Sequence, residues 1–436
     1  MDKIIVFCEH AVETLTYFSR QLADAFQEWG YEIFWMDFQM LGLSAWKLRQ
    51  AVQEQRKEAV LITFNFIGLS GEEELWDLDE EGEPMISLWE RLDMLCLNIM
   101  VDHPIYYFQA LRYPLPRLRT FCVDRDHVSY MKRFYPKICC EFLPLAGNCR
   151  MDAGVPAGNC LVDAGVPAGN CLPDAGVSAG NLEAEECVQQ NDLLFEQWVN
   201  RPYALVFTAN YVPVSNIDRQ LAGLEPEYRD FYYEIIDAFI QNPKQDLITC
   251  IEAYLSREMP GLSDEELCEG MSSMPAVDLW IRTYFREKTV RILAEGGIRV
   301  HLFGKDWEQV SCRHPENLVS VGRMVDSAEC VRAMAQAKLA LNTMPWFKDG
   351  AHDRIFTAML QGAAALTDDS AYLREQFRQM ETIAYYDLQK LEELPQQVSA
   401  LLDDPQRLFE TACRGRAAAQ RAHTWKSRAE ILKRCT

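Results

Sequence analysis

The sequence lacks any long apolar run. Although 49% of its 436 residues are hydrophobic, no apolar segment approaches the roughly 20 residues that a membrane-spanning helix needs. The start, Met1-Asp2-Lys3, carries neither a basic region nor a small-residue cleavage site, so we expect no export signal. The sequence therefore predicts a soluble protein of the cytoplasm, without a transmembrane segment.

Positive charge is also scarce. The chain has 43 Lys and Arg against 65 Asp and Glu, and its formal net charge is −22. This balance argues against binding to nucleic acid, because phosphates are bound by surfaces rich in Lys and Arg. Any cationic groups that bind an anionic substrate must then be local.

Paired cysteine motifs are missing as well. The chain has 15 cysteines, but their spacing is irregular and none forms a C-x-x-C cluster. We interpret them as reduced thiols rather than as a disulfide framework or a set of metal ligands. The sequence therefore predicts no metal site and no cofactor.

What the sequence does contain is an alternation of strands and helices. Apolar runs typical of buried strands alternate with amphipathic segments in both halves, which favours an α/β fold with parallel sheets. A chain of this length exceeds what one core fills, so we expect two domains, at 1–190 and 200–436. Their boundary is predicted near 187–202, and the second domain carries a helical insertion at 217–280. We expect the last helices, after Leu394, to cross back toward the first domain.

An eleven-residue repeat interrupts the first domain. The pattern Asp-Ala-Gly-Val-Pro-Ala-Gly-Asn-Cys-Leu begins at Asp152 and again at Asp163, and a shorter copy begins at Asp174. Its Gly, Pro and Asn content favours turns, and the repeats are too short to bury a core of their own. We interpret 147–186 as a surface insertion and predict that its repeats, 152–181, are dispensable.

The stretch 338–369 organises the second half, and its pattern predicts strand, loop, helix and strand. The turn Gly350–Arg354 ends the first strand and begins the helix. In a parallel sheet such a turn offers unpaired backbone N–H groups and the positive end of a helix dipole, which favour an anion such as a diphosphate. The guanidinium of Arg354 would add a forked partner for phosphate oxygens.

The helix after this turn resembles that of a known family. The run His352–Asp368, His-Asp-Arg-Ile-Phe-Thr-Ala-Met-Leu-Gln-Gly-Ala-Ala-Ala-Leu-Thr-Asp, resembles the C-terminal motif of GT-B glycosyltransferases of the spore-maturation CgeB-like group. Asp-His-Pro at 102–104 and the segment Cys122–Pro136 are similar to the N-terminal half of bacterial members. The resemblance implies a GT-B fold, in which two Rossmann-like domains with parallel sheets face each other across a cleft. Thr357 stands where such enzymes usually have a glutamate.

The resemblance also implies a nucleotide-sugar site in the second domain. A glycine at 304 would let the backbone approach the ligand, the next lysine would supply a point charge, and the loop at 322–323 would contact the base. The candidate donor-binding residues, at strand ends and at the start of one helix, are Asn210, Gly304, Lys305, Gly322, Arg323, Gly350, His352, Asp353, Arg354 and Thr357.

A catalytic base is expected in the first domain, because a sugar acceptor hydroxyl must lose a proton as it attacks the anomeric carbon. Asp102 and His103, at the predicted carboxyl end of a strand, are the candidates. His10, Glu9 and Asp124 are alternatives. A His that precedes Pro is often only a loop residue hydrogen-bonded to backbone.

Three functions fit this pattern. The first is a glycosyltransferase of hexosyltransferase type that moves a sugar from a nucleotide diphosphate sugar to an acceptor. It would work without a metal, since the Asp-Arg-Asp run at 124–126, which follows a predicted strand, can serve as the cap of the next helix and not as a site for a divalent ion. The second, motivated by Thr357, is a non-catalytic protein that keeps a nucleotide pocket, and the third is a nucleotide-sugar epimerase. The sequence leaves the base, the sugar, the acceptor and the oligomeric state open.

Overall fold

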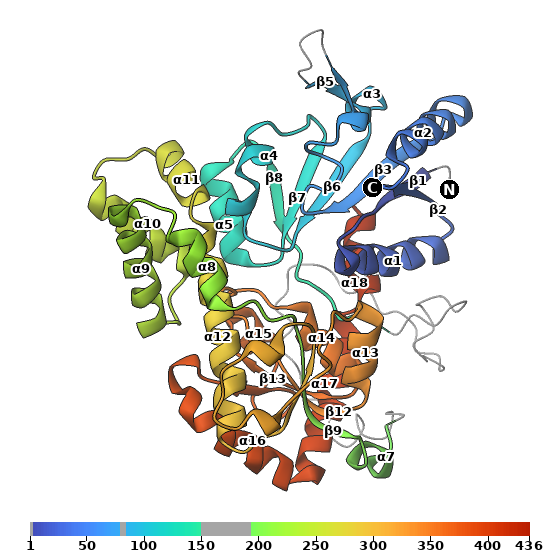
Figure 1. Cartoon of the computed structure of the whole chain (residues 1–436). Helices are drawn as coiled ribbons and strands as arrows, with labels where there is room; N and C mark the ends of the chain where they lie inside the picture. Colours follow the sequence, from blue (N-terminus) through green and yellow to red (C-terminus); the bar gives the residue numbers. More distant parts are fainter. Residues whose placement is uncertain (1–2, 79–83, 150–192) are drawn as a thin grey trace.

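The computed structural model describes residues 3–78, 84–149 and 193–436 (Figure 1). The repeats predicted to be dispensable, 152–181, lie outside the described residues. Within the described part, no helix is both long enough and apolar enough to cross a membrane.

The first domain is built on a six-stranded parallel sheet in the order β2-β1-β3-β6-β7-β8. Its central strands are apolar on both faces: Ile4, Val6 and Phe7 have no exposed surface, because helices cover both sides of the sheet. Register is regular, with Val6 of β1 opposite Phe34 of β2 and Leu61 of β3. The strands are β1 (Lys3–Glu9), β2 (Glu32–Asp37), β3 (Glu58–Phe64), β6 (Leu95–Met100), β7 (Leu118–Cys122) and β8 (Cys139–Phe142).

Helices of the first domain follow the strands one by one, as a doubly wound fold requires. They are α1 (Glu13–Glu28), α2 (Leu41–Gln55), α3 (Leu88–Arg91), α4 (Phe108–Arg112) and α5 (Arg125–Phe134). A small antiparallel hairpin, β4 (Trp76–Leu78) and β5 (Pro84–Ser87), stands at one edge of the domain.

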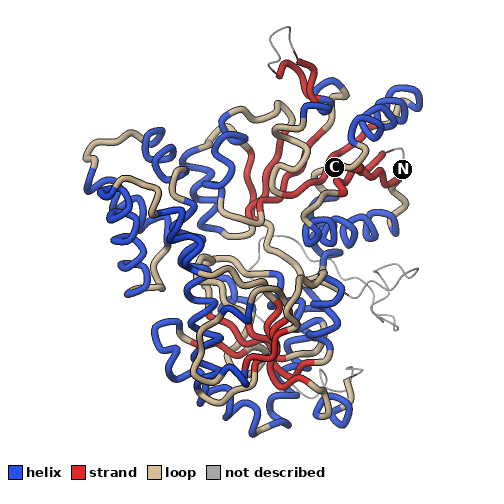
Figure 2. The backbone as a smooth tube through the Cα atoms, viewed as in Figure 1, coloured by secondary structure: helices blue, strands red, loops and turns tan. Residues whose placement is uncertain are grey.

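The second domain repeats this architecture with a six-stranded parallel sheet in the order β11-β10-β9-β12-β13-β14. Figure 2 shows the two sheets as separate groups of strands, each surrounded by helices. Together they confirm the predicted α/β fold class of two domains with parallel sheets. The strands are β9 (Tyr203–Thr208), β10 (Val300–Phe303), β11 (Leu318–Ser320), β12 (Ala337–Leu341), β13 (Ala364–Asp368) and β14 (Ala384–Tyr386).

Helices of the second domain fall into two groups. One group packs around the sheet: α7 (Phe195–Val199), α12 (Pro275–Glu295), α13 (Ser327–Ala335), α14 (Asp353–Leu360), α15 (Ala371–Gln376), α16 (Leu394–Asp403) and α17 (Pro405–Ala422). The other group, which overlaps the predicted insertion and begins three residues before it, is α8 (Val214–Leu221), α9 (Pro226–Gln241), α10 (Leu247–Glu258) and α11 (Asp264–Ser272). Helix α11 of this second group reaches the first domain, where Arg133 of α5 forms an ion pair of 2.7 Å with Asp264.

The end of the chain returns to the first domain. Helix α18 (Trp425–Lys433) lies beside α1, where the Trp425 ring packs 4.6 Å from that of Phe18. Beyond the other end of α18, Lys3 Nζ of β1 donates a hydrogen bond of 2.6 Å to the backbone oxygen of Thr436. Both ends of the described chain therefore belong to one domain, and the second domain is attached to it through two crossings.

Candidate functional site

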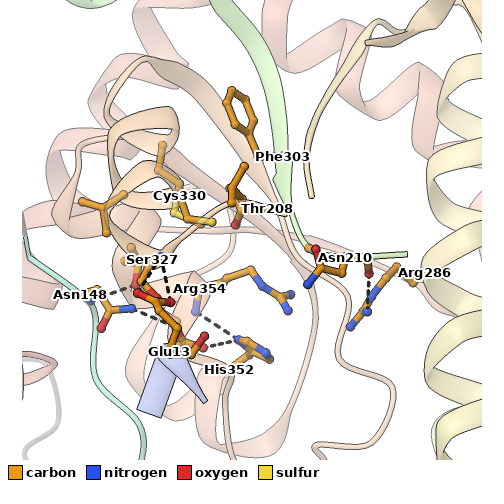
Figure 3. A pocket seen from close by; sticks show the side chains of 17 residues that line it. Glu13, Asn148, Thr208, Asn210, Arg286, Phe303, Ser327, Cys330, His352 and Arg354 are labelled. Carbon is orange, nitrogen blue, oxygen red and sulfur yellow. Dashed lines mark hydrogen bonds and ion pairs between the residues drawn. The ribbon is translucent and has the colours of Figure 1, made fainter. Parts of the chain in front are cut away.

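A cavity of about 340 Å³ lies between the domains, at the carboxyl edge of the second sheet. Parallel strands end there and helices begin, which is where α/β folds bind ligands. The second domain forms most of its wall, and helix α1 and Asn148 of the first domain close it (Figure 3). The polar lining residues are Glu13, Thr14, Asn148, Thr208, Asn210, Arg286, Ser327, His352, Asp353, Arg354 and Thr357.

Arg354 enters the cavity from the first turn of α14. Its Nη1 donates a hydrogen bond of 2.9 Å to Asn342 Oδ1, and the guanidinium carbon lies 5.6 Å from the centre of the Phe207 ring. Burial lowers the pKa of Arg354, and the charge of Asp353 opposes that shift. The side chain is thus held in place at the amino end of a helix, with its cationic head on the cavity.

Arg286 reaches the same cavity from α12 (Figure 3). Its Nη1 donates to the backbone oxygen of Asn210 at 3.0 Å, while its Nε is buried and has no hydrogen-bond partner among the described residues. Burial lowers the pKa of Arg286, and the charge of Arg354 lowers it further. Two cations therefore converge on one cavity, and among the described residues neither is ion-paired with a carboxylate, which favours an anionic ligand.

His352 and Asp353 form a hydrogen-bonded pair at the start of α14. His352 Nδ1 lies 2.6 Å from Asp353 Oδ1, and Asp353 Oδ2 accepts a hydrogen bond of 3.2 Å from Asn148 Nδ2. Burial lowers the pKa of His352, as does the charge of Arg354, whereas Asp353 opposes that change. The pair gives the cavity wall an imidazole whose orientation is fixed by a carboxylate.

Thr357, the residue in place of a glutamate, is buried below this pair. Its hydroxyl donates to the Asp353 backbone oxygen at 2.9 Å and accepts from the Asn148 backbone N–H, also at 2.9 Å. The short side chain thereby ties α14 to the segment that links the domains. A longer carboxylate at this position could not make the same two contacts.

Glu13, on the first turn of α1, crosses the cleft. Its carboxylate accepts hydrogen bonds from the Ser327 backbone N–H at 3.1 and 3.2 Å and from Ser327 Oγ at 2.7 Å. A carboxylate at the amino end of α13 is stabilised by the helix dipole. This contact closes one side of the cavity (Figure 3).

The structure brings half of the predicted donor-binding residues together. Asn210, His352, Asp353, Arg354 and Thr357 all line the cavity. The other five, which do not line it, are Gly304, Lys305, Gly322, Arg323 and Gly350.

The two glycines at 304 and 350 are required by contacts within the chain. A Cβ atom on Gly304, whose φ is +158°, would lie 2.1 Å from the Ala209 backbone oxygen. A Cβ on Gly350 would lie 2.5 Å from the Val123 backbone oxygen, because Gly350 forms a β-bridge with Asp124 of the first domain. At both glycines the close neighbour is the backbone of another segment of the protein, and not the ligand that the sequence led us to expect.

The other three lie in exposed loops. Arg323 forms an ion pair of 2.7 Å with Glu329, and Lys305 lies 3.6 Å from Asp306. Gly322 has a φ of +66° and would meet no atom if it carried a Cβ. A contact between this loop and a nucleotide base stays a prediction.

Asp102 and His103 lie outside the cavity. Asp102 Oδ1 is 3.2 Å from Arg282 Nη1 of α12, so it takes part in an interdomain ion pair. His103 is buried, and its Nδ1 accepts a hydrogen bond of 3.1 Å from the Ile105 N–H. A neutral imidazole with an accepting Nδ1 carries its proton on Nε2, so His103 has no free lone pair for a base. Burial also holds the pKa of His103 well below its usual value.

The three alternative candidates for the catalytic base, Asp124, Glu9 and His10, lie in two different places. Asp124 is buried and accepts hydrogen bonds from the backbone N–H groups of Asp126, Lys348 and Asp349, which is a structural role. Glu9 and His10 instead line a second cavity of about 620 Å³. It opens at the carboxyl ends of β1 and β2 and is lined by Glu9, His10, Ala11, Glu13, Thr16, Arg20, Asp37, Phe38 and Gln39.

Arg286, Ser327 and Glu13 are among the cavity residues that the sequence did not indicate, as are Thr14, Asn148 and Thr208. Glu13 begins the helix after the first strand, so the strand-end rule that selected Glu9 and His10 could have been extended to it. Arg286 lies in the middle of the longest described helix, where no local pattern distinguishes one arginine from another.

Comparison with known families concerns the second domain. Residues 282–434 match a family described as glycosyl transferase-like. The match contains Arg286 and all of α14, and it does not resolve the CgeB-like group, which stays a prediction. No curated protein matches the chain in sequence.

Solved structures of similar organisation cover nearly the whole chain at low identity. Sucrose-phosphate synthase from Thermosynechococcus elongatus has a TM-score of 0.48 at 10% identity, covering 99% of this chain and 98% of its own. The DNA-modifying β-glucosyltransferase has a TM-score of 0.47 at 11% identity, with the same coverage. Anabaena HepE, solved with UDP-glucose, has a TM-score of 0.44 at 10% identity and again 99% and 98% coverage.

Proposed function

We propose that the protein is a glycosyltransferase that transfers a sugar from a nucleotide diphosphate sugar to an acceptor. The observation that carries this proposal is the pair of guanidinium groups, Arg286 and Arg354, that share one cavity and form no ion pair with a carboxylate of the described residues. The glycosyl transferase-like match over 282–434 supports it, since both arginines lie in the matched segment. We further propose that the second domain, 200–436, holds the donor and that the first, 1–190, holds the acceptor.

The chemistry follows from the charge that develops at the leaving group. When the bond between the anomeric carbon and the diphosphate breaks, the electron pair moves onto a phosphate oxygen. Fixed cations and helix N–H groups aimed at that oxygen stabilise the transition state without reorganising. Arg354 and the amino end of α14 supply both, and Arg286 faces them from α12. A protonated His352, with its Nδ1 held by Asp353, would donate its Nε2–H to the same oxygens.

A transfer without a metal is part of the proposal. Among the described residues no group of three His, Cys, Asp or Glu is arranged to hold a metal ion. The two arginines would carry the charge stabilisation that a divalent cation supplies in other transferases. Activity that is unchanged by EDTA would support this point, and activity that requires added Mg²⁺ or Mn²⁺ would contradict it.

The non-catalytic reading is favoured by one observation, the replacement of the family glutamate by a Thr357 that is engaged with Asn148. It predicts nucleotide binding without cleavage. An epimerase would instead interconvert two nucleotide sugars without releasing the nucleotide.

A panel of UDP-, GDP-, dTDP- and CMP-sugars separates these functions. Thermal shift reports binding, because a ligand that binds the folded state raises its stability. Chromatography of the products reports released nucleotide or a new nucleotide sugar. If the wild-type protein releases nucleotide and a folded Arg354→Ala variant does not, the result supports a transferase. We further propose that the transferred sugar is a hexose and that the protein is cytoplasmic. Binding without any turnover, in the presence of a glycan and small-molecule acceptor library, would overturn the proposal.

A further inference from the structure

Glu13 occupies a singular position in the cleft. The donor cavity, where Arg286 and Arg354 lie, and the cavity at the ends of β1 and β2 share one lining residue among those the structure describes, and it is Glu13. A molecule bound in the second cavity would therefore reach the donor past this carboxylate. Neither Asp102 nor His103 lines either cavity.

The carboxylate of Glu13 is positioned by the opposite domain. Ser327 holds it through its N–H, at 3.1 and 3.2 Å, and through its Oγ, at 2.7 Å. An ionised carboxylate has about four lone-pair sites, so these three contacts leave it able to accept one more proton donor. Figure 3 shows the side chain at the edge of the cavity, beside the α14 residues that would hold the diphosphate.

We propose that Glu13 is the base that removes the proton from the acceptor hydroxyl, and that the cavity at the ends of β1 and β2 holds that acceptor. This inference rests on the proposed transferase function. In the transfer step the acceptor oxygen forms a bond to the anomeric carbon while the bond from that carbon to the diphosphate oxygen breaks. The electron pair of the broken bond goes to the diphosphate, and the hydroxyl proton goes to a carboxylate oxygen of Glu13.

The other polar groups of the acceptor cavity are less suited to this role. His10 Nδ1 accepts a hydrogen bond of 3.1 Å from the Val12 N–H, so its neutral ring presents an N–H and not a lone pair to the cavity. Glu9 forms an ion pair of 2.5 Å with Arg20. Asp37 accepts from the Gln39 N–H at 2.8 Å and does not border the donor cavity.

The cavity also restricts the class of acceptor. Its lining brings the three carboxylates of Glu9, Glu13 and Asp37 against one arginine, Arg20, which is already paired. An acceptor with a phosphate near the reacting hydroxyl would be repelled. A neutral polyhydroxyl compound or one that bears an amine fits this charge, and the half-buried Phe38 and His10 rings, which meet edge to face in the cavity wall, offer an apolar contact for a sugar ring.

The test uses UDP as the binding probe and a UDP-sugar that the wild-type protein cleaves. Glu13→Gln keeps the size of the side chain and can still accept from Ser327, but it cannot take up a proton. The matched control is Glu28→Gln, at the other end of α1, where Glu28 pairs with Lys426 on the surface. We expect Glu13→Gln to bind UDP within about twofold of the wild type and to cleave the UDP-sugar about 10²- to 10⁴-fold more slowly, the usual contribution of a general base. Glu28→Gln should match the wild type in both measurements.

Chemical rescue of Glu13→Ala provides a second test, which remains valid if Glu13→Gln does not fold. The measured quantity is the rate of UDP-sugar cleavage with and without an added carboxylate. A small carboxylate such as formate should restore part of this rate, and chloride at the same ionic strength should not. Wild-type cleavage in folded Glu13→Gln, or equal losses of UDP binding and cleavage, would overturn the role of Glu13 and leave the transferase proposal standing. A wild-type protein that binds UDP and turns over no nucleotide sugar would overturn both.

Discussion

Two arginines one turn apart on α12 have opposite surroundings. Arg282 lies between the domains, where its Nη2 is 2.6 Å from Asp278 Oδ2, its Nη1 is 3.2 Å from Asp102 Oδ1 and its guanidinium carbon is 4.3 Å from the centre of the Trp346 ring. Arg286 has no carboxylate in contact among the described residues and donates to a backbone oxygen. The same residue type on the same helix thus serves as an interdomain clamp in one place and as an open cation in the other.

The electrostatics of the two arginines differ accordingly. Burial acts against the charge of both, but Asp278 and Asp102 overcome it and raise the pKa of Arg282 above its usual value. Burial and two neighbouring arginines lower the pKa of Arg286. A buried cation without a carboxylate partner destabilises the folded state. We therefore expect that Arg286 does not contribute to the stability of the fold. Such a residue is expected where a ligand supplies the missing charge.

The largest effect should come from breaking the clamp. Arg282→Ala leaves the buried Asp278 carboxylate with the Tyr106 hydroxyl but without its cation, and we expect the free energy of unfolding to fall by about 3–5 kcal/mol. Urea denaturation measures this change. Replacing both residues, as in Arg282→Met with Asp278→Leu, should restore part of the loss, and an equal loss in the single and double variants would show that the ion pair is not the cause.

The second effect concerns Arg354, the cation at the amino end of α14. Arg354→Ala should weaken UDP binding by about 1.5–3 kcal/mol, the scale of a hydrogen bond to a charged group. Isothermal titration calorimetry gives the affinity, and thermal unfolding of the free protein gives the fold. Unchanged affinity in a folded variant would show that Arg354 is a structural residue and not a ligand-binding one.

Arg286→Ala should lie at the lower end of the same range, about 1.5 kcal/mol in UDP affinity, since Arg286 adds no helix dipole to its own charge. Unlike Arg282→Ala, it should cost the fold little or no stability. Removing an unpaired, partly buried cation should leave the free energy of unfolding within about 0.5 kcal/mol of the wild type, or raise it. A loss comparable to that of Arg282→Ala would erase the difference between the two arginines.

The smallest effect is a pH dependence from His352. Burial and Arg354 lower the pKa of its imidazole in the free protein, and a bound diphosphate would raise it again, so binding takes up a proton. UDP affinity should therefore increase as the pH falls from about 7.5 to 5.5, by less than about tenfold, beyond the change due to UDP itself. His352→Gln should remove this increment. His103→Gln, at a buried histidine outside the cavity, should retain it, and the same loss in both variants would refute the assignment.

The parallel sheets could be predicted because their physical cause is local. Strands buried on both faces are continuous apolar runs, as in Ile4–Phe7, and each is followed by an amphipathic helix. The same rule selected Arg354 at the start of α14 and also Asn210 and His352, and all three line the cavity. Gly350 does not line it, because β12 ends at Leu341 and Gly350 bridges Asp124. That these residues bind an anion stays a prediction.

The rest of the site depends on contacts between segments far apart in the chain. Gly304 and Gly350 do mark close approaches, but the sequence does not show that Ala209 and Val123, and not a ligand, approach them. Arg286 enters the cavity only because α12 crosses the cleft, so no neighbouring residue signals its role. Lys305 lies near a strand end as predicted, yet its long side chain turns toward Asp306 instead of the cavity.

The contacts between the two domains are spread along the cleft. Gly147 forms a bridge with Thr424, and the Gly147 N–H donates to the His423 backbone oxygen at 2.8 Å. Away from that bridge, Glu13 accepts from Ser327, Asp102 pairs with Arg282, and Arg133 pairs with Asp264. Separating the domains would break all of these contacts together, so the network that shapes the cavity also resists its opening.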